Sequence, residues 1–96
     1  MPRETDANQA EIIAALRQVG ASVYHVYQAS VPGVPDLVVG RVGADGVPRT
    51  YLLEVKTATG RLKRSQVEFR ASWRGPIAVV RTVDEALRAI GVEVEA

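Results

Sequence analysis

Two acidic residues and a lysine occur at the ends of two short apolar runs. Asp36 begins the first run, and Glu54, Val55 and Lys56 end the second. Carboxylate oxygens suit Mg²⁺ or Mn²⁺, which typically retain several waters and bind substrate phosphates. A lysine beside such a cation can orient a water molecule and offset charge that develops on a phosphate. These residue types therefore predict metal-dependent phosphodiester hydrolysis, provided that the fold brings them together.

A β-hairpin is expected to bring the three side chains together. Residues 36–41 and 49–56 read as strands, and the turn signal Gly-Ala-Asp-Gly of residues 43–46 separates them. A turn centred in this tetrapeptide places Asp36 opposite Leu53, next to the glutamate. The glutamate and the lysine are two residues apart, so their side chains leave the same strand face. The alternative interpretation is a surface cluster of ion pairs, which would contribute little stability.

The remaining elements form an α/β pattern around this hairpin. Three pairs match the spacing of a capping box and predict helix starts: Asn8 with Glu11, Ser65 with Glu68, and Thr82 with Glu85. We expect one domain over residues 1–96, an α/β fold with a mixed β-sheet, a central hairpin and flanking helices in αβββαβα order. The expected ranges are a helix over 8–19, strands over 21–28, 36–41, 49–56 and 77–81, helices from Ser65 to before Gly75 and from Thr82 to Ile90, and an edge strand or tail over 92–96.

The composition excludes several classes of site. The chain has 96 residues, of which 47% are hydrophobic and 24% charged, which fits one globular domain. It contains no cysteine, which excludes disulfides, cysteine zinc sites and a cysteine nucleophile, and His25 is the only histidine. No apolar run approaches the roughly 20 residues that cross a bilayer. Residues 1–10 are polar and do not resemble a signal peptide, so we expect a soluble, cytoplasmic protein without membrane association.

Basic residues are concentrated after the second hairpin strand. Residues 56–74 contain six basic side chains and one acid, whereas the rest of the chain is net acidic. Such a segment on a near-neutral chain predicts one face that contacts a polyanion, although a solvated loop and helix face explain it equally well. Tyr24 and Tyr27 can stack on bases or pack on the sheet, and Val67, Phe69 and Trp73 are expected to supply apolar contacts, with Trp73 in the core. The residues expected to contact DNA are Arg61, Lys63, Arg64, Tyr24 and Tyr27.

Several of these segments resemble a known nuclease family. Pro35-Asp36 followed by Glu54-Val55-Lys56 resembles the motif of the PD-(D/E)xK nuclease superfamily. Gly33-Val34-Pro35-Asp36-Leu37, Gly60-Arg61-Leu62 and Gln66, together with that motif, are similar to the VRR-NUC family. The resemblance covers nearly the whole chain and implies that the mixed β-sheet with its central hairpin is restriction-endonuclease-like. It departs from the family at residues 63–65, which are more basic than the family often is before its glutamine.

The resemblance assigns roles to individual residues. It implies that Asp36, Glu54 and the main-chain carbonyl of Val55 hold the metal, and that Lys56 is the catalytic lysine. It implies that Glu11 adds an acid from the first helix and that Gln66 is the glutamine that follows the lysine strand. The alternatives are a capping role for Glu11 and an exposed first-turn position for Gln66.

The expected function is that of a metal-dependent endonuclease acting on DNA, including structured or branched DNA such as four-way junctions. Because a domain of this size presents one active site, paired cleavage of two strands predicts a homodimer with two-fold symmetry. Two alternatives remain: a non-catalytic DNA-binding module with a nuclease-like fold, and a structural subunit whose basic segment contacts a protein.

Overall fold

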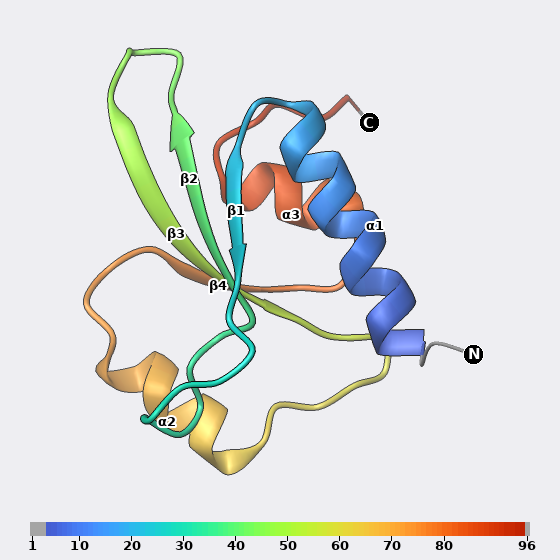
Figure 1. Ribbon diagram of the computed structural model, residues 1–96, viewed down its shortest axis with the longest axis vertical. Helices are drawn as coiled ribbons and strands as arrows, with labels where there is room; N and C mark the ends of the chain where they lie inside the picture. Colours follow the sequence, from blue (N-terminus) through green and yellow to red (C-terminus); the bar gives the residue numbers. More distant parts are fainter. Residues whose placement is uncertain (1–3, 96) are drawn as a thin grey trace.

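Helices and strands follow one another in the expected αβββαβα order (Figure 1). The computed structural model describes residues 4–95, and describes the side chains from residue 7 onward. The elements are α1 (Glu4–Gln18), β1 (Ser22–His25), β2 (Leu37–Val42), β3 (Pro48–Val55), α2 (Arg64–Ser72), β4 (Ile77–Val80) and α3 (Val83–Ala89).

The four strands form one mixed sheet with the spatial order β1-β2-β3-β4. The β1–β2 and β2–β3 pairs are antiparallel, and β3 pairs with β4 in parallel. A parallel pair needs a crossover connection, which here contains α2. The β2–β3 hairpin is therefore central, as the sequence predicts.

The hydrophobic core lies between α1, α3 and one face of the sheet (Figure 1). Alternation along β3 directs Leu53 and Val55 into this core and leaves Leu52 and Glu54 outside it, on the other face. The same period places Glu54 and Lys56 together on that other face. The core residues from the helices and neighbouring strands include Ile12, Leu16, Leu37, Val39, Val80, Ala86 and Ile90.

The first helix begins earlier than the sequence predicts. It starts at Glu4 rather than at Asn8, so Asn8 and Glu11 do not cap its N-terminus. No residue from Glu4 to Asn8 is a helix breaker, so the helix extends to Glu4. The side-chain amide of Asn8 makes long-range hydrogen bonds instead of capping the helix. Its Nδ2 donates to the carbonyls of Lys56 and Arg81, 2.9 and 3.2 Å away.

The second helix also differs from expectation, both at its start and in its packing. It begins at Arg64, and the Oε1 of Gln66 accepts a hydrogen bond of 2.8 Å from the backbone N–H of Lys63. The predicted pair of Ser65 and Glu68 therefore does not cap it. None of its residues is buried. Trp73, which directly follows the helix, is 44% exposed, so its predicted core position is wrong, and Val67 is 51% exposed. The predicted apolar contact of Phe69 and Trp73 is confirmed, because their rings stack with centroids 5.5 Å apart.

Three smaller predictions can be compared directly. The cap of α3 is confirmed, because the Thr82 hydroxyl accepts from the N–H of Glu85 at 3.1 Å. The strand expected over residues 21–28 ends at His25, before a segment whose prolines donate no N–H to a ladder. Residues 92–95 form no strand and continue as a tail. Within the described residues, no helix is long and apolar enough to cross a membrane.

Candidate active site

The site end of the hairpin brings Asp36 and Glu54 face to face. Leu37 pairs with Leu53, so Asp36 lies opposite Glu54. The expected partner of Asp36 was Leu53, one residue earlier. The Oδ2 atom of Asp36 accepts a hydrogen bond of 2.8 Å from the N–H of Val55. The main-chain oxygen of Asp36 accepts another, of 2.7 Å, from Val26. Asp36 is thus held by β3 on one side and by the residue that follows β1 on the other.

Glu54 is the buried acid of this site. Its exposed fraction is 3%, and it is the only charged residue among those described that is buried. Burial raises the pKa of Glu54 to about 9, and the hydrogen bond and negative charge of Asp36 add to this effect. No basic side chain in residues 7–95 forms an ion pair with Glu54. This carboxyl group is therefore poorly stabilised as an anion unless another cation approaches it.

Two lysines contribute positive charge beside this carboxyl group. The charges of Lys56 and Lys63 lower the pKa of Glu54 and only partly oppose its rise. Lys56 continues the parallel ladder beyond β3, because its N–H donates to the carbonyl of Val80 at 3.0 Å. The side chain of Val55 lies in the core, so only its main chain is available to the site. The structure therefore brings together Asp36, Glu54 and Lys56, and places Lys63 within electrostatic reach of them.

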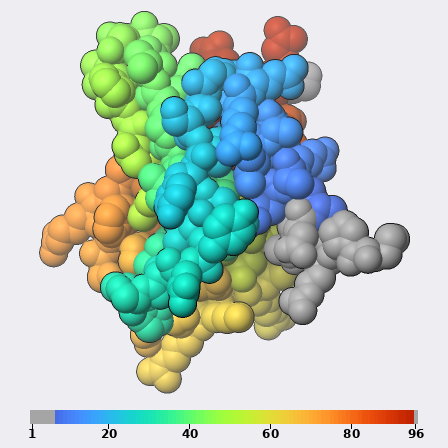
Figure 2. All heavy atoms as spheres, in the orientation of Figure 1, coloured from blue at the N-terminus to red at the C-terminus, as the bar shows by residue number. Residues whose placement is uncertain are grey.

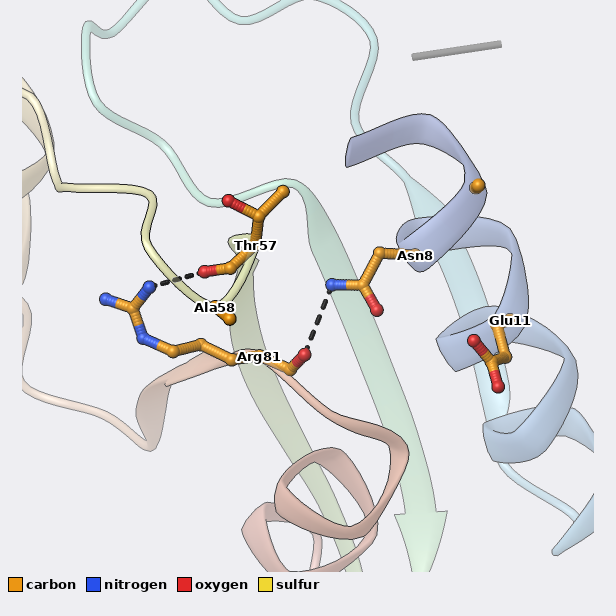
Figure 3. A pocket seen from close by; sticks show the side chains of 6 residues that line it. Asn8, Glu11, Thr57, Ala58 and Arg81 are labelled. Carbon is orange, nitrogen blue, oxygen red and sulfur yellow. Dashed lines mark hydrogen bonds between the residues drawn. The ribbon is translucent and has the colours of Figure 1, made fainter. Parts of the chain in front are cut away.

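Glu11 lies on the first helix, beside the chain that follows Lys56. It is exposed on α1 and lines a hollow together with Asn8, Thr57, Ala58 and Arg81 (Figure 3). The described residues contain no group of three acidic, histidine or cysteine side chains close enough to hold a metal ion. Glu11 therefore does not complete a cluster with the two hairpin acids in this structure.

Gln66 and the basic residues lie where the chain passes from β3 to α2. Gln66 caps α2 through Lys63, so it orders the segment that carries the basic side chains. Arg61 and Lys63 are exposed, and Arg64 pairs with Glu68 at 2.9 Å on the helix surface. Exposure of these cations is compatible with phosphate contact and with simple solvation.

The aromatic residues of the first strand are on the surface. Tyr24 and Tyr27 are 67% and 86% exposed, so neither ring lies in the core. The ring of Tyr27 contacts that of His25 with a centroid distance of 4.0 Å. Both phenol rings are thus accessible to a ligand.

Sequence reasoning missed the structural roles of three residues in this region. Arg81, at the end of β4, donates to the carbonyls of Thr57 and Gly60. Gly33 has a φ of 84°, and a Cβ at this position would collide with the carbonyl of Ser65. Figure 2 shows the segment before β2, in cyan to blue-green, against the yellow and orange atoms around α2. The third is Asn8, and in each case the signal is a contact between segments far apart in the sequence.

The donor set fits a hard divalent cation. Two carboxylates on adjacent strands repel each other when both are ionised, and a cation between them removes this repulsion. Mg²⁺ is commonly bound through one or two carboxylates, with waters and substrate phosphates completing its shell. Asp36, Glu54 and the carbonyl of Val55 are the groups that would hold it.

Comparisons with known proteins reveal one structural relative. No family model matches the sequence, and no curated protein matches it significantly. A solved structure described as a VRR_NUC domain superimposes on the chain with a TM-score of 0.72 and 19% sequence identity. The alignment covers 93% of this chain and 96% of the solved one. The chain therefore has the mixed α/β, nuclease-like fold of a VRR_NUC domain.

Proposed function

We propose that the protein is a VRR-NUC-type nuclease that uses a divalent metal ion to hydrolyse DNA phosphodiester bonds. The observation that carries this proposal is the pairing of Asp36 with the buried Glu54 beside Lys56. A purely structural ion-pair cluster would place a base against the buried acid, and no such pair occurs in the described side chains. A DNA-binding module would gain nothing from two opposed acids facing phosphates.

Each residue has a role that follows from its chemistry and position. When bound, Mg²⁺ or Mn²⁺ supplies Lewis-acid polarisation of the scissile phosphate and lowers the pKa of a bound water. Asp36 and Glu54 supply oxygen ligands, and the Val55 N–H keeps the Asp36 carboxylate oriented. Lys56 orients the attacking water and offsets negative charge on the phosphate. Glu11 forms no three-residue metal cluster with this pair among the described residues. Its proposed role stays that of an additional acid contributed by the first helix.

The proposed substrate contacts involve the segment after β3 and the exposed tyrosines. Arg61 and Lys63 are exposed beside the site, where their positive charges suit flanking phosphates. Arg64 can exchange its partner Glu68 for a phosphate, because a surface pair of this kind is weak. Tyr24 and Tyr27 offer flat apolar rings to unstacked bases, which favours branched or otherwise opened DNA such as a four-way junction.

A cleavage assay tests the chemistry. Linear, flapped and four-way DNA are incubated with the protein in Mg²⁺, Mn²⁺ or EDTA. We expect cutting with either metal and none in EDTA, and loss of cutting in Asp36→Asn while the circular dichroism spectrum stays unchanged. Full activity of Asp36→Asn, or activity in EDTA, would remove the site assignment.

The proposed homodimer is tested separately. One site per chain cuts one strand at a time, so paired cuts across a junction need a second site related by two-fold symmetry. Light scattering at assay concentrations should report a dimer, alone or on DNA. A strict monomer that still makes paired, simultaneous cuts contradicts this arrangement.

A further inference from the structure

The chain that follows the lysine strand is held in place by side chains from outside it. Residues 56–63 connect β3 to α2 and contain neither helix nor strand. The segment carries Lys56, Arg61 and Lys63, three cations that repel one another. Within the segment, one turn bond joins the N–H of Gly60 to the carbonyl of Thr57 at 3.2 Å. Its remaining order must come from contacts with other elements.

Arg81 supplies two of these contacts. Its Nη1 donates to the carbonyl of Thr57 at 2.6 Å and to the carbonyl of Gly60 at 2.7 Å. Figure 3 shows the guanidinium turned toward Thr57 across the hollow. Hydrogen bonds from a charged donor are roughly twice as strong as neutral ones, and these are partly buried. One nitrogen thus joins both ends of the turn that precedes the basic residues.

Asn8 fixes the start of the same segment. Its Nδ2 donates to the carbonyl of Lys56 and to that of Arg81, so one amide group joins α1 to the ends of β3 and β4. The N–H of Arg81 in turn donates to Glu85 at 2.7 Å, which ties its main chain to α3. Carbonyls of three residues between positions 56 and 60 are therefore held by side chains of α1 and of the end of β4.

We propose that Arg81, assisted by Asn8, is a positioning residue of the nuclease reaction. The two residues set the direction in which the chain leaves β3, and so hold Lys56 and the basic segment in one orientation relative to the Asp36–Glu54 pair. This role rests on the proposed function. Displacement of a catalytic group by about 1 Å can cost roughly 100-fold in rate. Loss of these hydrogen bonds therefore lowers kcat, while the surface cations still attract DNA.

The experiment compares Arg81→Met, Arg81→Lys and the matched control Arg88→Met, which removes an exposed arginine from α3. Cleavage kinetics are measured with the DNA that the wild type cuts, and DNA affinity is measured in EDTA over a range of salt. Arg81→Met should lower kcat roughly 10- to 100-fold. Amide exchange over residues 57–62 should accelerate roughly tenfold, with no change in α1. Arg81→Lys should recover most of both, because one ammonium can reach two carbonyls. Arg88→Met should match the wild type.

Affinity separates this role from a direct phosphate contact. A positioning residue leaves the salt dependence of binding unchanged, whereas loss of one phosphate contact lowers the slope of log K against log salt by about 1. Arg81→Met with full kcat and unaltered exchange overturns the positioning role, and so does a lowered slope with unchanged kcat. A wild type that cuts no DNA with either metal overturns the proposed function and, with it, this role. An active wild type beside a fully active Arg81→Met overturns the positioning role alone.

Discussion

The two ends of the β2–β3 hairpin place an acid in opposite environments. At the turn, Asp45 is exposed, and hydrogen bonds from Arg49 and from the N–H of Val47 hold the pKa of Asp45 well below its usual range. At the site end, burial and the neighbouring Asp36 raise the pKa of Glu54 to about 9. One hairpin thus favours ionisation at its turn and opposes it at the other end.

The difference separates an acid that stabilises a turn from the acid proposed to bind the metal ion. The pair of Asp45 and Arg49 is local, four residues apart, and helps to close a turn. Glu54 gains no comparable partner, and a buried acid beside another acid lowers the stability of the cation-free fold. Groups whose pKa is shifted by burial together with a charged neighbour, as that of Glu54 is and that of the exposed Asp45 is not, are concentrated in functional sites. The variants below test whether the two ends differ in this way.

The largest expected effect separates the two ends by activity. Lys56→Ala should reduce kcat roughly 10²- to 10³-fold, because it removes the cation that offsets charge on the phosphate. Arg49→Ala, at the turn, removes a cation of the same hairpin and should leave cleavage unchanged. Steady-state cleavage of the preferred DNA measures both. Equal losses in the two variants would show that net charge, rather than position, supports the reaction.

A second comparison uses two glycines with positive φ. Gly33 lies before β2 with a φ of 84°, and Gly46 lies in the turn with a φ of 78°. A side chain at Gly46 meets nothing within 4 Å, whereas one at Gly33 collides with Ser65. Gly46→Ala should cost about 1–2 kcal/mol of the free energy of unfolding, and Gly33→Ala more. Urea denaturation measures both, and a larger loss for Gly46→Ala would contradict the packing of this segment on α2.

The third prediction concerns stability and pH. Because the folded-state pKa of Glu54 lies above the value of about 4.5 expected for the unfolded chain, the folded protein retains a proton that the unfolded chain has lost. The cation-free protein should therefore lose stability as pH rises between these two values, by at most about 1.4 kcal/mol for each pH unit.

Glu54→Gln provides the control for this pH dependence. Its amide cannot ionise, so the slope should flatten and the variant should exceed the wild type in stability at pH 8 in EDTA. Denaturant titrations from pH 5 to pH 9 give both slopes. Parallel slopes for the two proteins would place the pH dependence elsewhere.

The smallest effect is expected at the turn. The lowered pKa of Asp45 stabilises the fold at neutral pH, and this contribution is lost as pH falls through the folded-state value. Both partners are exposed and screened by solvent, so Asp45→Asn should shift the thermal midpoint less than either Gly46→Ala or Gly33→Ala. A shift as large as that of Gly33→Ala would contradict this prediction and show that the Asp45–Arg49 pair contributes strongly to stability.

Sequence reasoning predicted the hairpin, the order of elements and the acid pair because each depends on local periodicity. Strand alternation and a single turn suffice to place Asp36 beside Glu54, and the observed register differs from the expected one by one residue. The predicted start of α1 was wrong, although Asn8 is a good capping residue. Its side chain instead donates hydrogen bonds to carbonyls of residues that lie 48 and 73 positions further along the chain. No local pattern encodes such a contact.

The packing of α2 was not predictable for a related reason. Val67 and Trp73 are apolar, as expected for residues that face a core. The helix nevertheless lies at the periphery, and both side chains are exposed. Burial depends on what lies opposite a helix, and here α1 and α3 already cover the core face of the sheet. Likewise, the exposure of Tyr24 and Tyr27 depends on tertiary neighbours, although aromatic residues suit a strand.

The pairing of β2 with β3 also limits which insertions and deletions this domain tolerates. Deletion of one residue within β3, between the turn and position 54, would move each following side chain to the opposite face of the sheet. The glutamate would then point into the hydrophobic core. Insertion of residues in the exposed turn at residues 43–47 would change only the turn, because the pairing of β2 with β3 stays the same. Thr50 and Tyr51 touch no proposed ligand. The number of such residues between the turn and Glu54 nevertheless determines on which face of the sheet the Glu54 side chain lies.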